Sequence, residues 1–117
     1  MKPTAVLIQG SRGGIVDEAA LAECLAACKR YGIQCHVWKV NWNTFGRTPK
    51  DFLDRINKEG RFQVAYDGKA HKEWLCPSHP YNQRLEIEAM AELATKYDVD
   101  GIHFDYIRYP GAEFCFC

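Results

Sequence analysis

The sequence has no excess of charge of either sign and no stripe of basic residues interleaved with aromatics. Its 15 Lys and Arg residues balance 15 Asp and Glu residues, so the formal net charge at pH 7 is zero. A protein that binds nucleic acid needs a positive surface, because contacts with the phosphate backbone supply much of the affinity. Nucleic acid is therefore not an expected partner.

The sequence also has no long apolar run. The apolar residues 5–8 follow only MKPT and are too few for the apolar region of a signal peptide, and no stretch approaches the length of a membrane-spanning helix. As written, the chain is expected to be soluble and unexported, with no membrane partner, while the location of the complete protein stays open. Its 117 residues, 47% of them hydrophobic, are enough for one domain with a real core and too few for two.

Cysteine is abundant, with six residues, but a disulfide framework does not explain all of them. Cys24 and Cys28 are four apart in an amphipathic helical pattern, and Cys35 lies in an apparent strand, so we interpret these three as small buried hydrophobic residues. Cys76 and the Cys-x-Cys pair at 115–117 fall in loops. That pair is half of a metal site or half of a disulfide, and both alternatives stay open. No metal ligands are assigned, and no cofactor is expected.

The rest of the chain alternates between strand and helix patterns. Strands are predicted at 4–9, 33–42 and 100–107, with helices at 17–31 and from about residue 80 to residue 97 between them. Parallel strands need connections of about a dozen residues or more, and such crossovers are right-handed. The pattern therefore predicts an α/β fold whose three strands are adjacent and parallel in that order, with the helices on one side.

Three shorter features complete the prediction. Thr48 is expected to be the N-cap of a short helix with Pro49 at the first helical position. Residues 62–74 are expected to form a small β-hairpin around the Asp67-Gly68 turn. The glycine-rich segment 10–14 (GSRGG) lacks the spacing of a phosphate-binding loop and is interpreted as a turn.

The most informative segment is 97–110, YDVDGIHFDYIRYP. Strand alternation places Ile102 and Phe104 on one face and His103 and Asp105 on the other. One face is expected to pack on helices and the other to meet a cavity. In (β/α) barrels the catalytic groups come from the carboxyl ends of strands, and Asp105 sits at such an end.

Three parallel strands alone would leave two sheet edges unpaired and one sheet face uncovered, which soluble proteins avoid. The chain is therefore predicted to be a single partial (β/α)8 barrel domain, residues 1–117, with three parallel strands, crossover helices and a hairpin excursion. In this interpretation it is a fragment of a larger glycosidase-like barrel. Its expected macromolecular partners are the remainder of the barrel or, through the open sheet edges, further copies of itself.

Two motifs carry a resemblance to a known family. Residues 74–80 (WLCPSHP), followed after a helix by 97–110, resemble the glycosyl hydrolase-like 10 family. The resemblance extends back over 35–38 (CHVW), similar to the family's His-x-Trp strand, and over 6–9 (VLIQ), similar to its preceding strand. Because the family has (β/α)8-barrel catalytic domains, the resemblance implies that the chain corresponds to about strands two to four.

The resemblance also implies hydrolysis of glycosidic bonds in a polysaccharide or other glycan. Glycosidases normally use two carboxylates that flank the bond, and only Asp105 is well placed here. The GIHFD segment is similar to a strand ending in amylase-type barrels whose aspartate is the nucleophile. Asp105 is therefore the candidate nucleophile or charge stabiliser, with its partner acid outside this chain. The alternative is that Asp105 only forms a salt bridge with Arg108 at the barrel rim.

Further residues are candidates for contacts with the sugar. Imidazole, guanidinium and amide groups can hydrogen-bond hydroxyls, and aromatic rings suit a sugar's apolar face. For 33–42 the two faces give conflicting indications, because a lysine fits a polar cavity mouth whereas the family resemblance favours His36 and Trp38. Both faces are kept. The candidates are His103, Tyr106, Arg108, Gln9, Arg12, His36, Trp38, Lys39, Asn41, Trp42 and Trp74.

Two alternatives to a glycoside hydrolase remain. A truncated barrel could retain sugar contacts without its second carboxylate and act as a non-catalytic carbohydrate-binding protein. A metal-dependent barrel hydrolase is a further possibility, but the sequence has no His-x-His or clustered acid motif to support it. A glycoside hydrolase would cleave a glycan, whereas a carbohydrate-binding protein would bind it without turnover. The 117-residue piece by itself is expected to be inactive.

Overall fold

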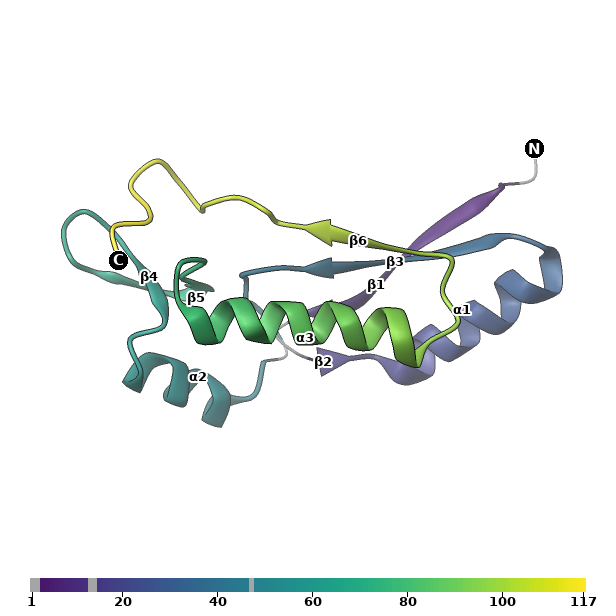
Figure 1. Cartoon of the computed structure of the whole chain (residues 1–117), viewed down its shortest axis with the longest axis horizontal. Helices are drawn as coiled ribbons and strands as arrows, with labels where there is room; N and C mark the ends of the chain where they lie inside the picture. Colours follow the sequence, from purple (N-terminus) through teal and green to yellow (C-terminus); the bar gives the residue numbers. More distant parts are fainter. Residues whose placement is uncertain (1–2, 13–14, 47) are drawn as a thin grey trace.

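The computed structural model describes residues 3–12, 15–46 and 48–117, and it is an α/β structure with two sheets (Figure 1). The first sheet has the strand order β2-β1-β3-β6, and the second pairs β4 with β5. The strands are β1 (Ala5–Arg12), β2 (Ile15–Val16), β3 (Gln34–Val40), β4 (Phe62–Val64), β5 (Ala70–Leu75) and β6 (Gly101–Asp105). The helices are α1 (Glu18–Tyr31), α2 (Lys50–Lys58) and α3 (Pro80–Lys96).

The predicted parallel sheet is confirmed. β1 pairs in parallel with β3, and β3 pairs in parallel with β6, while the two-residue β2 is antiparallel to β1. The predicted hairpin is also confirmed, since β4 and β5 are antiparallel. Over the described ranges the sheet does not close into a barrel, and none of the helices is long and apolar enough to cross a membrane.

Both crossover helices cover the same side of the larger sheet (Figure 1). The core between them contains Leu21 of α1, Val37 of β3, and Met90 and Leu93 of α3, all buried, and Ile8 and Ile102 pack against it. Val37 is central because β3 is paired on both edges, so its side chain meets both helices. This core determines which face of each strand is covered and which is left for a site.

The ends of α1 follow from its sequence. Asp17 is the N-cap, and its carboxylate accepts a hydrogen bond from the Ala20 amide at 3.1 Å. Gly32 ends the helix in the left-handed conformation at φ 62°, which glycine adopts without steric cost. The prediction for this helix and its glycine stop is confirmed.

The start of α2 differs from the prediction. Pro49, not Thr48, is the N-cap, and its carbonyl accepts the first intrahelical hydrogen bond from the Leu53 amide at 3.1 Å. Thr48 lies one residue further out, and its buried hydroxyl has no hydrogen-bond partner among the described residues. The helix is held by packing instead, because Ile56 is fully buried in a second core with Phe62 and Leu75.

The sequence pattern of the helix predicts a buried stripe of Ile87, Met90, Ala91 and Ala94, and the buried residues of α3 differ from this set. Met90 is buried as expected, but Ile87 is 68% exposed. The helix is rotated so that polar residues face inward. Its buried residues are Asn82, Glu86, Met90 and Leu93. The reason is that both buried polar side chains have partners on neighbouring elements, which compensate the cost of burying them.

The glycine-rich segment is not a turn at its start, because Gly10, Ser11 and Arg12 continue β1. Gly13 and Gly14 lie outside the described residues. The pairing of β1 with β3 shifts register between Gln9 and Ser11, as in a β-bulge. At the shift, a Cβ on Gly10 would come within 2.1 Å of Val37 Cγ1, so only glycine lets the strand pack this closely on the core.

Candidate functional site

The strand register separates the two faces of the sheet. Leu7 is opposite His36, Gln9 is opposite Trp38, and Trp38 is opposite His103. Residues directly opposite each other on paired strands point to the same face. The face turned away from α1 and α3, here called the open face, therefore carries Leu7, Gln9, His36, Trp38, His103 and Asp105.

Asp105 is the last residue of β6, and its side chain is half-buried. One carboxylate oxygen accepts a hydrogen bond from the Tyr106 amide at 2.8 Å. The strand end itself is fixed to β3, because the Asn41 amide donates to the Asp105 carbonyl at 2.9 Å. The carboxylate is thus held at the carboxyl edge of the sheet, on the open face.

The structure does not support the rim salt bridge between Asp105 and Arg108. No ion pair joins these two residues, although both lie within the described ranges. The Arg108 guanidinium lies instead over the rings of Tyr106 and Trp74, at 4.9 Å and 5.6 Å from the ring centroids. Arg108 is therefore engaged in cation–π contacts, and no cation within the described part of the chain forms an ion pair with the Asp105 carboxylate.

The hairpin brings Trp74 to the carboxyl edge of the sheet. The Leu75 amide donates to the Trp42 carbonyl at 2.7 Å, and Asn43 forms an isolated bridge with Trp74. The Trp74 ring packs on Tyr106, with centroids 5.8 Å apart, but only 5% of Trp74 is exposed. In this conformation Trp74 packs beneath the more exposed Tyr106 and Arg108, and little of its own surface is accessible to a sugar.

Two residues just past the strand ends have strained backbones. Trp42 follows the end of β3 with φ 60°, and Tyr106 follows the end of β6 with φ 59°. A bulky residue at positive φ costs on the order of 1–3 kcal/mol, and such residues cluster at functional sites. Both are candidate site residues, and their strain lies where the chain turns away from the sheet beside Asp105.

Two histidines form the polar centre of the open face. His36 Nδ1 lies 2.8 Å from His103 Nε2, and the His36 Nε2 atom lies 3.4 Å from the Gln34 side-chain oxygen. Gly101 makes room for this pair, since a Cβ there would come within 2.5 Å of His36 Nδ1. His103 is exposed, so it is not a buried core histidine whose hydrogen bonds are satisfied inside the protein.

Lys39 and Asn41 lie on the opposite, helix-covered face, where both side chains bind Glu86 of α3. Lys39 Nζ and Asn41 Nδ2 lie 2.5 Å and 2.6 Å from the same Glu86 oxygen. The other oxygen accepts from the Trp42 amide at 3.2 Å. The argument that a lysine suits a cavity mouth better than a position under a helix therefore fails here, because Glu86 supplies the compensating charge. Glu86 was missed in the sequence, where its four-residue spacing to Met90 was the available signal.

The remaining candidates occupy the edges of the site. Gln9 is exposed on the open face, and Arg12 is the last residue of β1. Trp42 lies on the helix side, where it lines a pocket of about 400 Å³ together with Phe104, Ile107 and Met90. The structure thus brings Gln9, His36, Trp38, His103 and Asp105 together on one surface and separates them from Lys39, Asn41 and Trp42.

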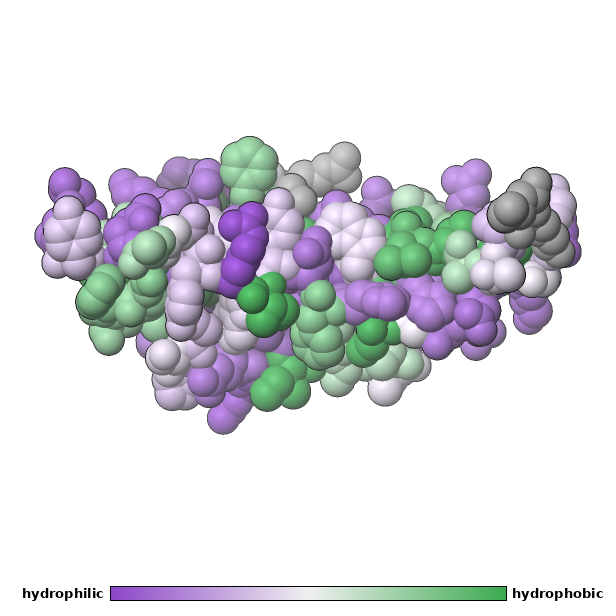
Figure 2. All heavy atoms as spheres, turned by 90° about the horizontal axis from the view of Figure 1, so that it is seen from above, coloured by the Kyte–Doolittle hydropathy of each residue, from purple (hydrophilic) through white to green (hydrophobic). Residues whose placement is uncertain are grey.

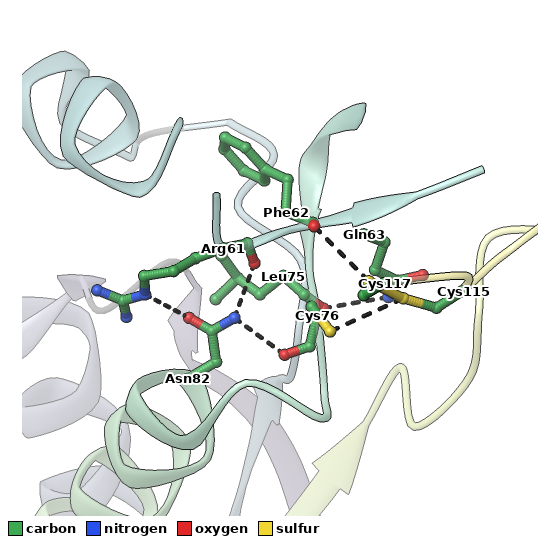
Figure 3. Close-up of a disulfide and its surroundings, with 8 residues drawn as sticks. All are labelled: Arg61, Phe62, Gln63, Leu75, Cys76, Asn82, Cys115 and Cys117. Carbon is green, nitrogen blue, oxygen red and sulfur yellow. Dashed lines mark hydrogen bonds between the residues drawn. A yellow bond between two sulfur atoms is a disulfide. The ribbon is translucent and has the colours of Figure 1, made fainter. Parts of the chain in front are cut away.

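The Cys-x-Cys pair forms a disulfide between its own two members, Cys115 and Cys117 (Figure 3). Cys76 Sγ lies 3.8 Å from Cys115 Sγ. The C-terminal segment is placed there by backbone hydrogen bonds to the hairpin, including one from the Phe116 amide to the Val64 carbonyl at 2.8 Å. This arrangement fastens the C-terminal segment to the hairpin of β4 and β5.

A comparison with protein families matches the glycosyl hydrolase-like 10 model over residues 3–115. No curated protein and no solved structure gives a significant match. The family match spans nearly the whole chain, including all the strands and the segment that ends at Asp105. The chain therefore belongs to the glycosyl hydrolase-like 10 family.

Proposed function

We propose that this chain is the part of a glycoside hydrolase barrel that carries a catalytic carboxylate, Asp105. The observation that carries the proposal is the position of Asp105 at the carboxyl end of a parallel strand, on the sheet face opposite the one that α1 and α3 cover. In (β/α) barrels this face lines the interior and this edge forms the active site. Membership of a glycosyl hydrolase-like family gives the position its chemistry.

Asp105 acts as the nucleophile or as the charge that stabilises an oxocarbenium-like transition state. Hydrolysis by the usual mechanism needs a second carboxyl group as general acid. The open face of the described strands presents no second Asp or Glu, and Glu86 is buried in its ion pair on the other side. The partner acid is therefore supplied from outside these strands.

The other open-face side chains are suited to holding a sugar. The His36–His103 pair and Gln9 offer hydrogen-bond donors and acceptors to hydroxyl groups, and the half-buried Trp38 ring offers a surface for the apolar face of a pyranose. Tyr106 and the exposed Arg108, stacked on each other, border the same edge and extend the binding surface beyond Asp105.

The two tryptophans on opposite faces give a matched pair for a binding test. We expect Trp38→Ala to weaken glycan binding roughly tenfold, the loss of about 1.4 kcal/mol of stacking. Trp42→Ala should lower thermal stability and leave the intrinsic affinity of the folded fraction unchanged, because Trp42 packs in the core with Ile56 and Phe62. Isothermal titration and thermal melts of both variants check this, and equal losses of affinity would contradict the assignment of faces.

The barrel is completed by its remaining strands or by self-association through the open edges. β6 is the last strand of its sheet, and Phe104 in this strand and Ile107 just after it are 62% and 61% exposed. Figure 2, which views the molecule from the β6 side, shows apolar patches between polar ones. Such an edge pairs readily with another strand. We expect the isolated chain to associate or to unfold at low denaturant; sedimentation velocity that finds a stable monomer would contradict this.

A non-catalytic carbohydrate-binding protein is the second candidate, favoured by the single carboxylate on the open face. Calorimetric titration with soluble polysaccharides and assay of new reducing ends, both on the intact protein, test the two candidates together. Binding with release of reducing ends supports the hydrolase, and binding without turnover supports the binding protein. A protein that neither binds nor cleaves any glycan tested would contradict both.

A further inference from the structure

Three free thiols that lie far from Asp105 converge between α1 and β3. Cys24 Sγ lies 4.0 Å from Cys28 Sγ and 3.9 Å from Cys35 Sγ, and all three sulfur atoms lie within 4.8 Å of one another. Cys28 and Cys35 are buried and Cys24 is half-buried. The sequence alone indicated three separate small hydrophobic residues, so their convergence is a result of the fold.

The local chain geometry explains the convergence. Cys24 and Cys28 are one turn apart on α1 and share the face of the helix that meets the sheet. Gly32 reverses the chain within two residues, so Cys35, the second residue of β3, comes to lie against the C-terminal half of α1. The Cys35 amide donates to Asp100 Oδ2 at 2.8 Å, which fixes this end of the strand.

The sulfur spacing matches a metal-bound trio. Zn²⁺ binds thiolate sulfur at about 2.3 Å, so two sulfurs on a tetrahedral ion lie about 3.8 Å apart. The two separations that involve Cys24, 4.0 Å and 3.9 Å, are close to that value. The third separation, between Cys28 Sγ and Cys35 Sγ, is at most 4.8 Å. An ion could therefore enter the trio with a shift of no more than about 1 Å between α1 and β3.

A cleft beside Cys28 and Cys35 gives these two members of the trio access to solvent and to further oxygen ligands. The cleft has a volume of about 290 Å³ and is lined by Cys28, Cys35, Asp98, Asp100 and Lys29, among others. Its two carboxylates would favour a cation electrostatically. A water molecule in the cleft could occupy the fourth position that three protein ligands leave open.

We propose that Cys24, Cys28 and Cys35 form a binding site for one soft divalent cation, with Zn²⁺ as the natural occupant. Binding replaces three S–H protons, which leave to solvent, by three sulfur–metal bonds, with no change of oxidation state. The site lies at the amino end of β3, opposite Asp105. In a (β/α) barrel, residues at the amino-terminal face of the strands contribute to stability, whereas the active site lies at the carboxyl-terminal face. The ion therefore fastens α1 to the sheet and takes no part in catalysis.

The state without metal is compatible with the same geometry. Burial raises the pKa of the Cys35 thiol to about 12 and also raises the pKa of Cys28. The thiols are therefore neutral near pH 7 and can be buried as weakly interacting small groups. The trio tolerates an empty state, and occupancy then adds its binding free energy to the folded state only.

The test is a titration with Co²⁺, which gives intense thiolate-to-metal absorption when sulfur binds it, followed by displacement with Zn²⁺. The full chain with Cys115→Ser and Cys117→Ser is the background, so that the sulfur cluster near Cys76 cannot contribute three ligands. We expect one equivalent of Co²⁺ to bind and Zn²⁺ to displace it and raise the melting temperature. Adding Cys24→Ser or Cys35→Ser should abolish the absorption, while adding Cys76→Ser should leave it unchanged.

Circular dichroism establishes that each variant is folded, and Cys24, being half-buried, is the substitution that the fold tolerates best. The wild-type chain without reductant, which keeps the Cys115–Cys117 bond, provides a second measurement if the background variant does not fold. The proposal is overturned if Cys24→Ser binds Co²⁺ like its parent, if Cys76→Ser removes the absorption, or if no thiolate absorption develops in a folded protein. These results are independent of whether Asp105 is catalytic.

Discussion

Replacing Asp105 by asparagine in the intact protein is expected to reduce glycan hydrolysis by on the order of 10³-fold or more, with folding unchanged. Asparagine keeps the shape of the side chain and can still accept the hydrogen bond from the Tyr106 amide, but it has no negative charge. A neutral amide can neither act as the nucleophile nor stabilise a positively charged transition state, so the variant should lose activity. Steady-state kinetics on a cleaved glycan, alongside thermal melts, measure both consequences.

Asp98→Asn is the matched control, because Asp98 is an exposed carboxylate near the amino end of the same strand. Its turnover should remain within about twofold of wild type, since surface changes of this kind rarely alter stability by more than about 0.5 kcal/mol. Arg108→Ala should raise KM more than it lowers kcat if its stacked guanidinium borders the sugar. Near-normal turnover of Asp105→Asn would remove the main support for the hydrolase assignment.

The sheet was predictable because its strands and crossovers each leave a strong local signal. The periodic helical pattern that ends at Gly32 and the apolar strands on either side leave few alternatives to a parallel arrangement. The site edge was predictable for the same reason, since Asp105 ends a strand that belongs to this parallel arrangement. The hairpin followed from Asp67-Gly68, a turn whose backbone twist matches paired strands.

The orientation of α3 was not predictable from hydrophobic periodicity. Ile87 has the more apolar side chain, yet Glu86 is the residue that turns inward, because Lys39 and Asn41 offer partners there. Periodicity scores a carboxylate as a surface residue whatever lies opposite it. The ion pair joins Lys39 and Glu86, which are 47 positions apart in the sequence, and no local pattern contains that information.

The face of β3 that lines the cavity could not be predicted for the same reason. Lys39 alone favoured its own face as the cavity side, whereas His36 and Trp38 favoured the opposite face. Only the tertiary contact with Glu86 shows how a lysine is accommodated under a helix. The convergence of Cys24, Cys28 and Cys35 is a further long-range result, since the spacing of the first two shows only that they share a helix face.

Breaking the buried ion pair between Glu86 and Lys39 should have the largest effect on stability. Only 3% of the Lys39 side chain and 9% of the Glu86 side chain are exposed. In Glu86→Gln, the Lys39 ammonium would keep only a neutral amide and its contact with the Val40 carbonyl at 3.2 Å. Leaving a buried charge unpaired costs about 3–5 kcal/mol, so the unfolding midpoint in urea should fall sharply.

Two further variants separate the pair from general effects on α3. Glu88→Gln changes the same residue type on the exposed side of the helix and should alter the free energy of unfolding by less than about 0.5 kcal/mol. Lys39→Met combined with Glu86→Leu removes both charges and should recover most of the stability, because a buried ion pair contributes little more than apolar packing of similar volume. The recovery is partial, since Asn41 and the Trp42 amide also lose their acceptor.

The comparison of these variants also tests how the two faces of the sheet are kept distinct. If Glu86 holds β3 in register under α3, then Glu86→Gln should disturb Trp38 and His36 on the open face as well, through the strand that carries them all. Glycan affinity measured under conditions where the variant remains folded would then fall together with stability. An unfolding midpoint equal to that of Glu88→Gln would instead mean that Lys39 reaches solvent in the native state, and the buried pair would not be what positions the strand.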